Sequence, residues 1–320
     1  MNSDFFKDKH VLVAGGAGFI GSHLISKLLL AGAKVRAADI KDKPQINDSR
    51  IEYVQCDLTR KEDCQKVVKG MDYVFMAAAN TAGAAVMEHK PLVHVTPNVI
   101  MNGLMLESSH EAGVKKFLFI SSNTVYPDLD TPMKEEDMKY GDVFYKYYFV
   151  AWMKQFSEVM CQMYAKGKSP MKTIIVRPAN SYGPYSNFDP EMSHVIPALI
   201  RKVVERQNPL PVWGDGTDIK DFIYVEDLVE GMLLAMEKLE TPDPVNLATG
   251  KQCTIKEILH DILEIDGYKD AKIEFDTSKP MMIKKRLISP EKAKAVLGFE
   301  AKTPLKDGLQ KTISWYRSTL

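Results

Sequence analysis

The hydrophobic positions follow two alternating patterns through the first half of the chain. Short apolar runs of strand length occur at 11–14, 35–39, 51–56, 73–77, 116–121 and 173–177. Between them, apolar residues with helical spacing fall near 21–31, 60–69, 98–112 and 145–166. Alternation of this kind is typical of a parallel sheet with helices on both faces. The pattern therefore predicts an α/β fold of the Rossmann type, with a doubly wound parallel sheet.

The second half of the chain is divided differently, because prolines break it into loops and short elements. These prolines are Pro178, Pro184, Pro190, Pro197, Pro209 and Pro211. Short apolar runs at 221–225 and 245–247 are predicted to be strands that return to the first domain. We therefore expect a Rossmann domain of residues 1–181 plus 218–250 and a smaller α/β substrate-binding lobe of residues 182–217 plus 251–320.

A glycine-rich turn separates the first predicted strand from the first predicted helix. Gly15 and Gly18 allow a tight turn and a close approach to a pyrophosphate, and Gly21 allows the helix to pack near the strand. The free N–H groups at the start of the helix favour negative charge. Strand, glycine turn and helix in this order predict a dinucleotide-binding site.

The choice of dinucleotide depends on the end of the second predicted strand. Asp39 stands there, where a carboxylate accepts hydrogen bonds from a ribose diol and repels a 2′-phosphate. This favours NAD over NADP, although Arg36 and Lys41 are near enough in sequence to contact a phosphate. Asp57-Leu58 follows the third strand and is expected near the adenine. Ala77 and Ala78 end the fourth strand with side chains small enough for a cofactor to pass.

Composition excludes several classes of partner. The chain has 42 Lys plus Arg and 42 Asp plus Glu, so it carries no basic field for nucleic acid or an anionic membrane. Its four cysteines show no CxxC spacing, as expected for reduced thiols. No apolar run approaches the roughly 18 residues that span a bilayer, and the first residues are polar. We expect a cytoplasmic protein.

The glycine turn is one of five motifs that belong together: 15–21 (GGAGFIG), 120–127 (ISSNTVYP), 177–184 (RPANSYGP), 212–216 (VWGDG) and 220–227 (KDFIYVED). These motifs give the chain a resemblance to the extended short-chain dehydrogenase/reductase family, in particular to its nucleotide-sugar epimerases and reductases. The stretch at 187–199 resembles the branch that contains GDP-fucose synthase, which favours GDP as the nucleotide. The resemblance covers essentially the whole chain.

The resemblance implies a catalytic group with one departure from the family pattern. Ser122 matches the hydroxyl that orients the substrate, and Lys154 matches the lysine that holds the nicotinamide ribose. The family's tyrosine, which acts as the base four residues before that lysine, is replaced by Val150. A valine side chain cannot exchange a proton. Tyr147, seven residues before Lys154 on the same predicted helix face, is a possible substitute.

Two other positions bear on the reaction type. Asn123 and Thr124 stand where the dehydratase relatives carry an Asp-Glu pair, so dehydration is not expected. Relatives that epimerise beside a ketone carry a Cys at the position of Thr124. His194 matches the histidine of that branch and is a candidate acid or base near neutral pH.

The resemblance also implies contacts to the two ligands. Asn123, Asn180 and Trp213 are expected at the substrate, with Lys220 and Arg286 as cations for its diphosphate. The expected cofactor contacts are Gly15, Gly18, Phe19, Ile20, Gly21, Asp39, Asp57, Leu58, Ala77, Ala78, Lys154 and Arg177.

The favoured function is therefore inversion at C4 of a nucleoside-diphosphate hexose through a transient ketone, with NAD. One alternative is reduction or 3,5-epimerisation of a 4-keto-6-deoxy sugar nucleotide, with His194 as the acid. Another is a protein without activity that binds NAD and a nucleotide sugar, which Val150 favours. In relatives, the helices near 98–112 and 145–166 form a four-helix dimer interface, so the resemblance implies a homodimer here.

Overall fold

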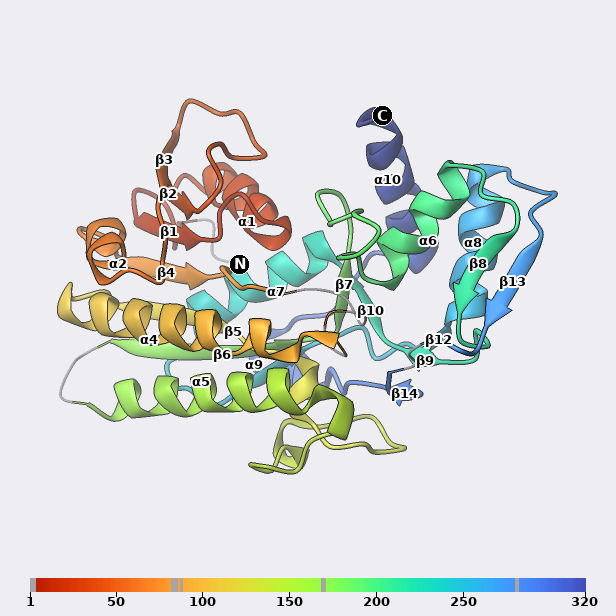
Figure 1. Cartoon of the computed structure of the whole chain (residues 1–320). Coiled ribbons are helices and arrows are strands. Elements are labelled where there is room, and N and C mark those ends of the chain that lie inside the picture. The colour runs from red at the N-terminus through yellow and green to blue at the C-terminus, as the bar shows by residue number, and fades with distance from the viewer. Residues whose placement is uncertain (1–3, 82–85, 87–88, 168–170, 280–281) are drawn as a thin grey trace.

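The computed structural model describes residues 4–81, 86, 89–167, 171–279 and 282–320, and its centre is a seven-stranded parallel sheet (Figure 1). The strand order is β3-β2-β1-β4-β5-β6-β11. The predicted α/β fold of the Rossmann type is confirmed. The strands are β1 (His10–Ala14), β2 (Lys34–Asp39), β3 (Ile51–Gln55), β4 (Tyr73–Met76), β5 (Lys116–Ile120), β6 (Lys172–Pro178) and β11 (Val245–Leu247).

Helices cover both faces of this sheet. Helices α1 (Phe19–Leu30) and α7 (Val225–Lys238) pack on one face, and α2 (Lys61–Val68), α4 (Thr96–Glu111) and α5 (Tyr148–Lys166) on the other. Strand β1 shows why, because its side chains alternate between the two faces. Val11 and Val13 belong to the first apolar core, whereas Leu12 and Ala14 belong to the second. Both faces are apolar, so both must be covered.

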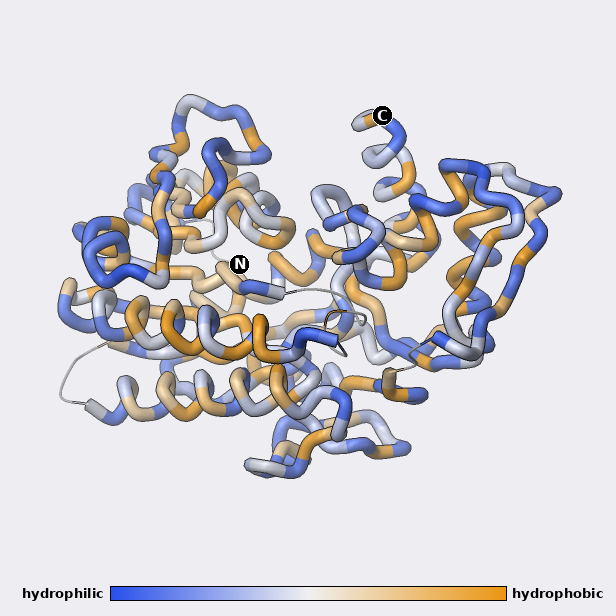
Figure 2. The backbone as a smooth tube through the Cα atoms, in the orientation of Figure 1, coloured by the Kyte–Doolittle hydropathy of each residue, from blue (hydrophilic) through white to orange (hydrophobic). Residues whose placement is uncertain are grey.

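The remaining elements lie mostly beside the carboxyl ends of the strands, at the right of Figure 1. Figure 2 shows that hydrophobic and hydrophilic positions alternate along their helices, as expected where one side faces a core. They comprise β7 (Asn180–Tyr182), α6 (Val195–Val204), β8 (Leu210–Trp213), β9 (Ile219–Lys220), β10 (Phe222–Tyr224), β12 (Cys253–Thr254), α8 (Ile255–Asp266), β13 (Ile273–Asp276), β14 (Lys285–Arg286), α9 (Glu291–Leu297) and α10 (Leu305–Ser318).

Three details differ from the expectations. Strand β10 pairs with β7 in a sheet of two strands and does not join the central sheet, whereas β11 does. Helix α9 packs on α7 and β11, although residues 251–320 were assigned to the smaller lobe. The helix predicted at 145–166 begins with a 3-10 turn, η4 (Tyr145–Tyr147), and α5 starts only at Tyr148.

Three further 3-10 turns connect the elements: η1 (Pro91–His94), η2 (Asn123–Val125) and η3 (Glu135–Asp137). Among the helices in the described ranges, none combines the length and apolar character needed to cross a membrane.

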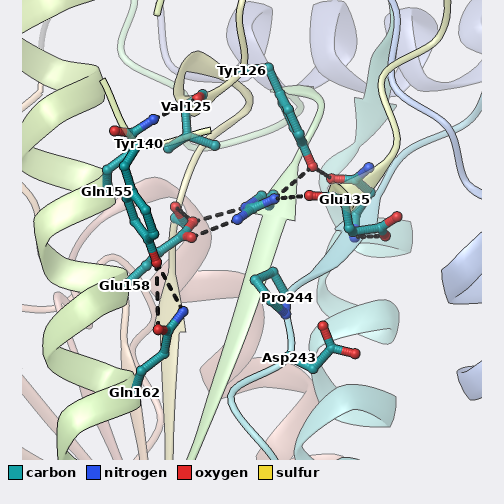
Figure 3. A network of polar contacts seen from close by, with 12 residues as sticks. Val125, Tyr126, Glu135, Tyr140, Gln155, Glu158, Gln162, Asp243 and Pro244 are labelled. Atoms are coloured by element: carbon teal, nitrogen blue, oxygen red, sulfur yellow. Dashed lines mark hydrogen bonds and ion pairs between the residues drawn. The ribbon is translucent and has the colours of Figure 1, made fainter. Parts of the chain in front are cut away.

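A buried ion pair joins α5 to the sheet (Figure 3). The side chains of Arg177 on β6 and Glu158 on α5 are 1% and 0% exposed. Arg177 Nε and Nη2 donate to the two Glu158 carboxylate oxygens at 2.9 and 2.7 Å. Its Nη1 donates to Tyr126 Oη and to the Glu135 carbonyl, both at 3.0 Å. The pair therefore fixes α5, β6 and the segment after β5 relative to one another.

Replacing Glu158 by alanine would leave the Arg177 charge buried without its partner. We expect Glu158→Ala to lower the free energy of unfolding by about 3–5 kcal/mol. The matched control is Glu107→Ala, because Glu107 pairs with Lys61 at the surface and such pairs contribute less than about 1 kcal/mol. Urea denaturation of both variants measures the difference. Equal small losses would contradict a structural role for the buried pair.

Candidate functional site

The glycine turn between β1 and α1 is shaped for a close backbone neighbour. Gly15 has φ +81°, and a Cβ there would lie 2.5 Å from the Ala78 nitrogen. A Cβ on Gly21 would overlap the Gly15 carbonyl. No side chain caps the start of α1, and its first turn holds no acidic residue, so its N–H groups suit an anion. This turn fits the pyrophosphate of a dinucleotide.

Asp39, at the end of β2, lies against the same turn. Its Oδ2 accepts from the Ala17 N–H at 3.0 Å, and its Oδ1 accepts from the Lys41 N–H at 3.1 Å. Lys41 Nζ in turn donates to the Ala17 carbonyl at 3.2 Å. Arg36 is engaged elsewhere: it donates to the Val67 and Lys69 carbonyls and pairs with Glu52. A carboxylate, with Lys41 beside it, therefore faces the expected ribose position.

Some of the other predicted cofactor contacts adjoin the glycine turn, and others are buried or bonded within the protein. Phe19 and Ile20 stand in the first turn of α1, and Leu58 is buried in the apolar core. The pKa of Asp57 is lowered, because its carboxylate accepts hydrogen bonds from Thr59. Arg177 uses all three guanidinium nitrogens in the buried network, so its side chain has a structural role. Gly18, Ala77 and Ala78 adjoin the glycine turn through the Gly18 N–H to Gly15 bond and the end of β4.

Lys154 and Ser122 lie at the carboxyl end of β5. Lys154 Nζ donates to the Ile120 carbonyl at 2.7 Å, two residues before Ser122. Burial lowers the pKa of Lys154 to about 8, and the charge of Glu158 opposes that change. Ser122 Oγ accepts from the Thr124 N–H and hydroxyl at 3.1 and 2.9 Å, which leaves its own proton for a substrate oxygen. Asn123 Nδ2 donates to the Pro178 carbonyl at 3.1 Å.

Val150 lies one helical turn before Lys154 and is 7% exposed. It borders a small hollow together with Pro91, His94, Lys146 and Phe149. His194 is the N-cap residue of α6. Burial and, to a smaller extent, the charge of His94 lower the pKa of His194. The structure thus brings the two histidines and Val150 to one region. His94 was not predicted from the sequence, because a single histidine in the stretch 91–94 has no motif around it.

The predicted substitution of the missing base by Tyr147 is wrong in its geometry. Tyr147 precedes α5 and lies in the 3-10 turn, so it does not share a regular helix face with Lys154. Its ring lies 5.5 Å from the Arg286 guanidinium. Burial raises the pKa of Tyr147, and the charge of Arg286 opposes that rise. The phenol thus serves as a platform for a cation.

The two predicted diphosphate cations are neighbours. Lys220 on β9 stands in register with Arg286 on the parallel strand β14. Arg286 is 1% exposed, and its Nη1 donates to the Pro127 carbonyl at 3.0 Å. Within the described part of the chain, its Nε and Nη2 have no hydrogen-bond partner. Lys220 donates to the Ile283 carbonyl and lies 3.6 Å from Asp218. Buried donors without partners are costly, so this place suits an anion.

The last two predicted substrate residues lie on two strands outside the central sheet. Asn180 on β7 donates through Nδ2 to the Asp221 carbonyl at 3.0 Å. Asp221 itself is fully buried, and burial raises its pKa to about 6. Trp213 ends β8 with 43% of its surface exposed. Trp213 is thus open to a ligand, whereas the Asn180 amide already binds the backbone between β9 and β10.

Comparison with known proteins gives consistent matches. The family model named NAD dependent epimerase/dehydratase family matches residues 11–248. GDP-L-fucose synthase of Sinorhizobium fredii is 32% identical over 319 residues, covering 98% of this chain and 96% of that protein. dTDP-4-dehydro-6-deoxy-D-allose reductase of Streptomyces bikiniensis is 27% identical over 332 residues and covers 99% of each. The structure of UDP-glucose 4-epimerase of Thermotoga maritima with UDP-glucose is 28% identical, with a TM-score of 0.86 and coverage of 97% and 99%.

The buried ammonium of Lys154 predicts a pH dependence of stability. Its folded pKa of about 8 lies below the ordinary lysine pKa of 10.5, so the unfolded chain binds more protons between these values. Relative to Lys154→Met, the wild type therefore gains about 3 kcal/mol of unfolding free energy as the pH rises through this window. Urea denaturation at several pH values measures the difference. A constant difference between the two proteins would contradict the lowered pKa.

Proposed function

This chain belongs to the NAD dependent epimerase/dehydratase family, and we propose that it inverts C4 of a nucleoside-diphosphate hexose. It is an enzyme of the nucleotide-sugar epimerase and reductase group. The observation that carries the proposal is the buried Arg286 guanidinium, with two nitrogens lacking partners among the described residues, beside Lys220 in register. A diphosphate supplies the oxygens that these donors need.

The cofactor site fits NAD through the chain's own groups. The glycine turn and the start of α1 would hold the pyrophosphate, and Asp39 would accept from the adenosine ribose. Lys154 would hold the nicotinamide ribose, and the Ser122 hydroxyl would orient the sugar oxygen. When bound, NAD accepts a hydride from a carbon that bears a hydroxyl and returns it. Since the carboxylate of Asp39 repels a 2′-phosphate, NAD is favoured over NADP.

The nucleotide and the type of reaction are proposed from the sequence and from the relatives. The stretch at 187–199 and the similarity to a GDP-L-fucose synthase favour GDP. A UDP-glucose 4-epimerase has the same fold, which supports inversion without net redox change. The second candidate is reduction or 3,5-epimerisation of a 4-keto-6-deoxy sugar, supported by His194 and by the similarity to a keto-sugar reductase. A binding protein without turnover remains the third, because of Val150.

The test is turnover of a panel of GDP-, UDP-, CDP- and dTDP-hexoses and 4-keto-6-deoxy sugars, followed by nuclear magnetic resonance. We expect the chain to convert one hexose to its C4 epimer with NAD bound and no net consumption of NAD(P)H. Lys154→Met is the control and should be inactive, because it removes the ammonium that holds the ribose. Val150→Tyr, run in parallel, tests whether a phenol at this position adds activity.

The other outcomes decide between the alternatives. Consumption of NAD(P)H with a keto sugar would replace the epimerase by a reductase. Activity only in Val150→Tyr would identify a disabled epimerase and its substrate. Absence of turnover in both proteins, with cofactor bound, would favour the binding protein.

We also propose that two copies pair through α4 and α5. The outward side of α5 exposes Trp152, Phe156 and Met163 by 41%, 47% and 62%, and α4 exposes Ile100 by 40%. A stripe of large apolar side chains on two adjacent helices suits a partner surface of the same kind. Four helices, two from each copy, would bury it.

Charges in the centre of this stripe should separate the copies. We expect the double variant Trp152→Glu and Phe156→Glu to elute as a monomer where the wild type is a dimer, as measured by light scattering after size exclusion. The control is Ile273→Glu, which adds a charge at an apolar residue of β13 that is also 40% exposed. A monomeric wild type, or a dimeric double variant, would refute this interface.

A further inference from the structure

His94, the last residue of η1, has a ring with two differently placed nitrogens. The residue is 2% exposed, and its Nδ1 lies 3.1 Å from the Asn80 carbonyl oxygen. A carbonyl oxygen only accepts, so Nδ1 carries a proton and donates it. In the neutral ring, Nε2 then holds the basic lone pair. The contact with Asn80 thus selects the tautomer in which Nε2 can accept a proton.

The Asn80 carbonyl is itself fixed by α4. Asn98, which is 1% exposed, donates through Nδ2 to the Asn80 and His94 carbonyls at 2.9 and 2.7 Å. The Asn80 N–H donates to Asn98 Oδ1 at 2.8 Å. Asn98 therefore holds both the acceptor of the His94 proton and the backbone of His94. A base oriented by a third group in this way is a recurrent arrangement in catalysis.

His94, whose Nε2 is the second ring nitrogen, lies close to Val150, the position at which the family carries a tyrosine. In the described ranges, Nε2 is buried and has no hydrogen-bond partner. Leaving a buried polar atom unpaired is unfavourable, so such an atom calls for a function. His94 and Val150 border the same hollow, and Val150 stands where the family carries its proton acceptor.

We propose that His94 Nε2 is the general base and acid of this enzyme, in place of a phenol at position 150. The inference rests on the proposed function. Nε2 takes the proton from the sugar hydroxyl while the hydride leaves the same carbon for NAD, which yields a ketone and an imidazolium. When the hydride returns to the opposite face of the carbon, Nε2 gives the proton back to the oxygen. Protons and electrons balance over the cycle.

The surrounding charges come from two other elements. Lys146 of η4 borders the hollow, and His194 at the start of α6 is near enough to interact with His94. Burial and, to a smaller extent, the charge of His94 lower the pKa of His194, which favours its neutral form. A neutral His194 does not oppose the imidazolium that forms on His94.

The tautomer is tested without turnover, by ¹⁵N nuclear magnetic resonance of the whole chain with labelled histidine. We expect the His94 signals, assigned by their loss in His94→Gln, to show a protonated Nδ1 and a bare Nε2. Addition of the hexose found in the turnover panel should shift the Nε2 signal. A neutral ring with its proton on Nε2 and none on Nδ1 would overturn the proposal. An Nε2 signal that does not shift on addition of the hexose would overturn it as well.

Kinetics test the role of the nitrogen. We expect His94→Gln and His94→Ala to lower kcat by about 100-fold to 10,000-fold, with KM changed only a few-fold. Added imidazole should restore part of the activity to His94→Ala, which a purely structural role would not allow. The double variant His94→Phe and Val150→Tyr should regain activity with the pH profile of a phenol. His260→Gln, on the exposed side of α8, is the matched control and should keep the wild-type kcat.

The outcomes separate this inference from the proposed function. An active wild type whose His94→Gln variant keeps full kcat would overturn the role of His94 alone, and loss of activity in His194→Gln would then assign the base to His194. A wild type that binds NAD but converts no sugar would overturn both proposals together. Folding of each variant is checked by its thermal midpoint.

Discussion

The ion pair between Glu158 and Arg177 sets the position of the helix on which the site depends. Both charges are inaccessible to water, so each is tolerated only while the other stays in contact. Glu158 lies one turn after Lys154 and two turns after Val150 on α5, whose side chains four apart share a face. A shift of α5 along β6 would separate the charges. The pair therefore fixes where Lys154 meets the end of β5.

Lys154 is kept at this place although it destabilises the fold. Its ammonium is buried, its pKa falls to about 8, and Glu158, its nearest compensating charge, already serves Arg177. A methionine would fill a similar volume without the charge. A buried ammonium with a lowered pKa at the end of a strand is typical of a functional site, not of a residue that serves packing. The retained lysine is thus the strongest internal argument against a chain that has lost its chemistry.

The sequence predicted what depends on neighbours along the chain. Period-two and period-3.6 patterns placed the central strands and their helices within a few residues, and the positive φ of Gly15 follows from its place in the turn. The 3-10 turn before α5 was not predicted, because its aromatic residues fit a helical period equally well. The position of helix α9 was not predicted either, since its packing on α7 depends on tertiary contacts. His94 carried no local signal: its tautomer is set by Asn80, fourteen residues earlier.

The loss of a phenol at position 150 changes what the other groups must do. A tyrosine has a pKa near 10, so it needs a neighbouring ammonium to act as a base at neutral pH. An imidazole has an intrinsic pKa near 6.5 and needs no such help. On the proposed mechanism, Lys154 only holds the ribose, and the group that exchanges the proton lies on η1 instead of α5. On this proposal Lys154 and Ser122 keep their roles beside a valine. The Nε2 of His94, a residue that borders the hollow, has no hydrogen-bond partner among the described residues.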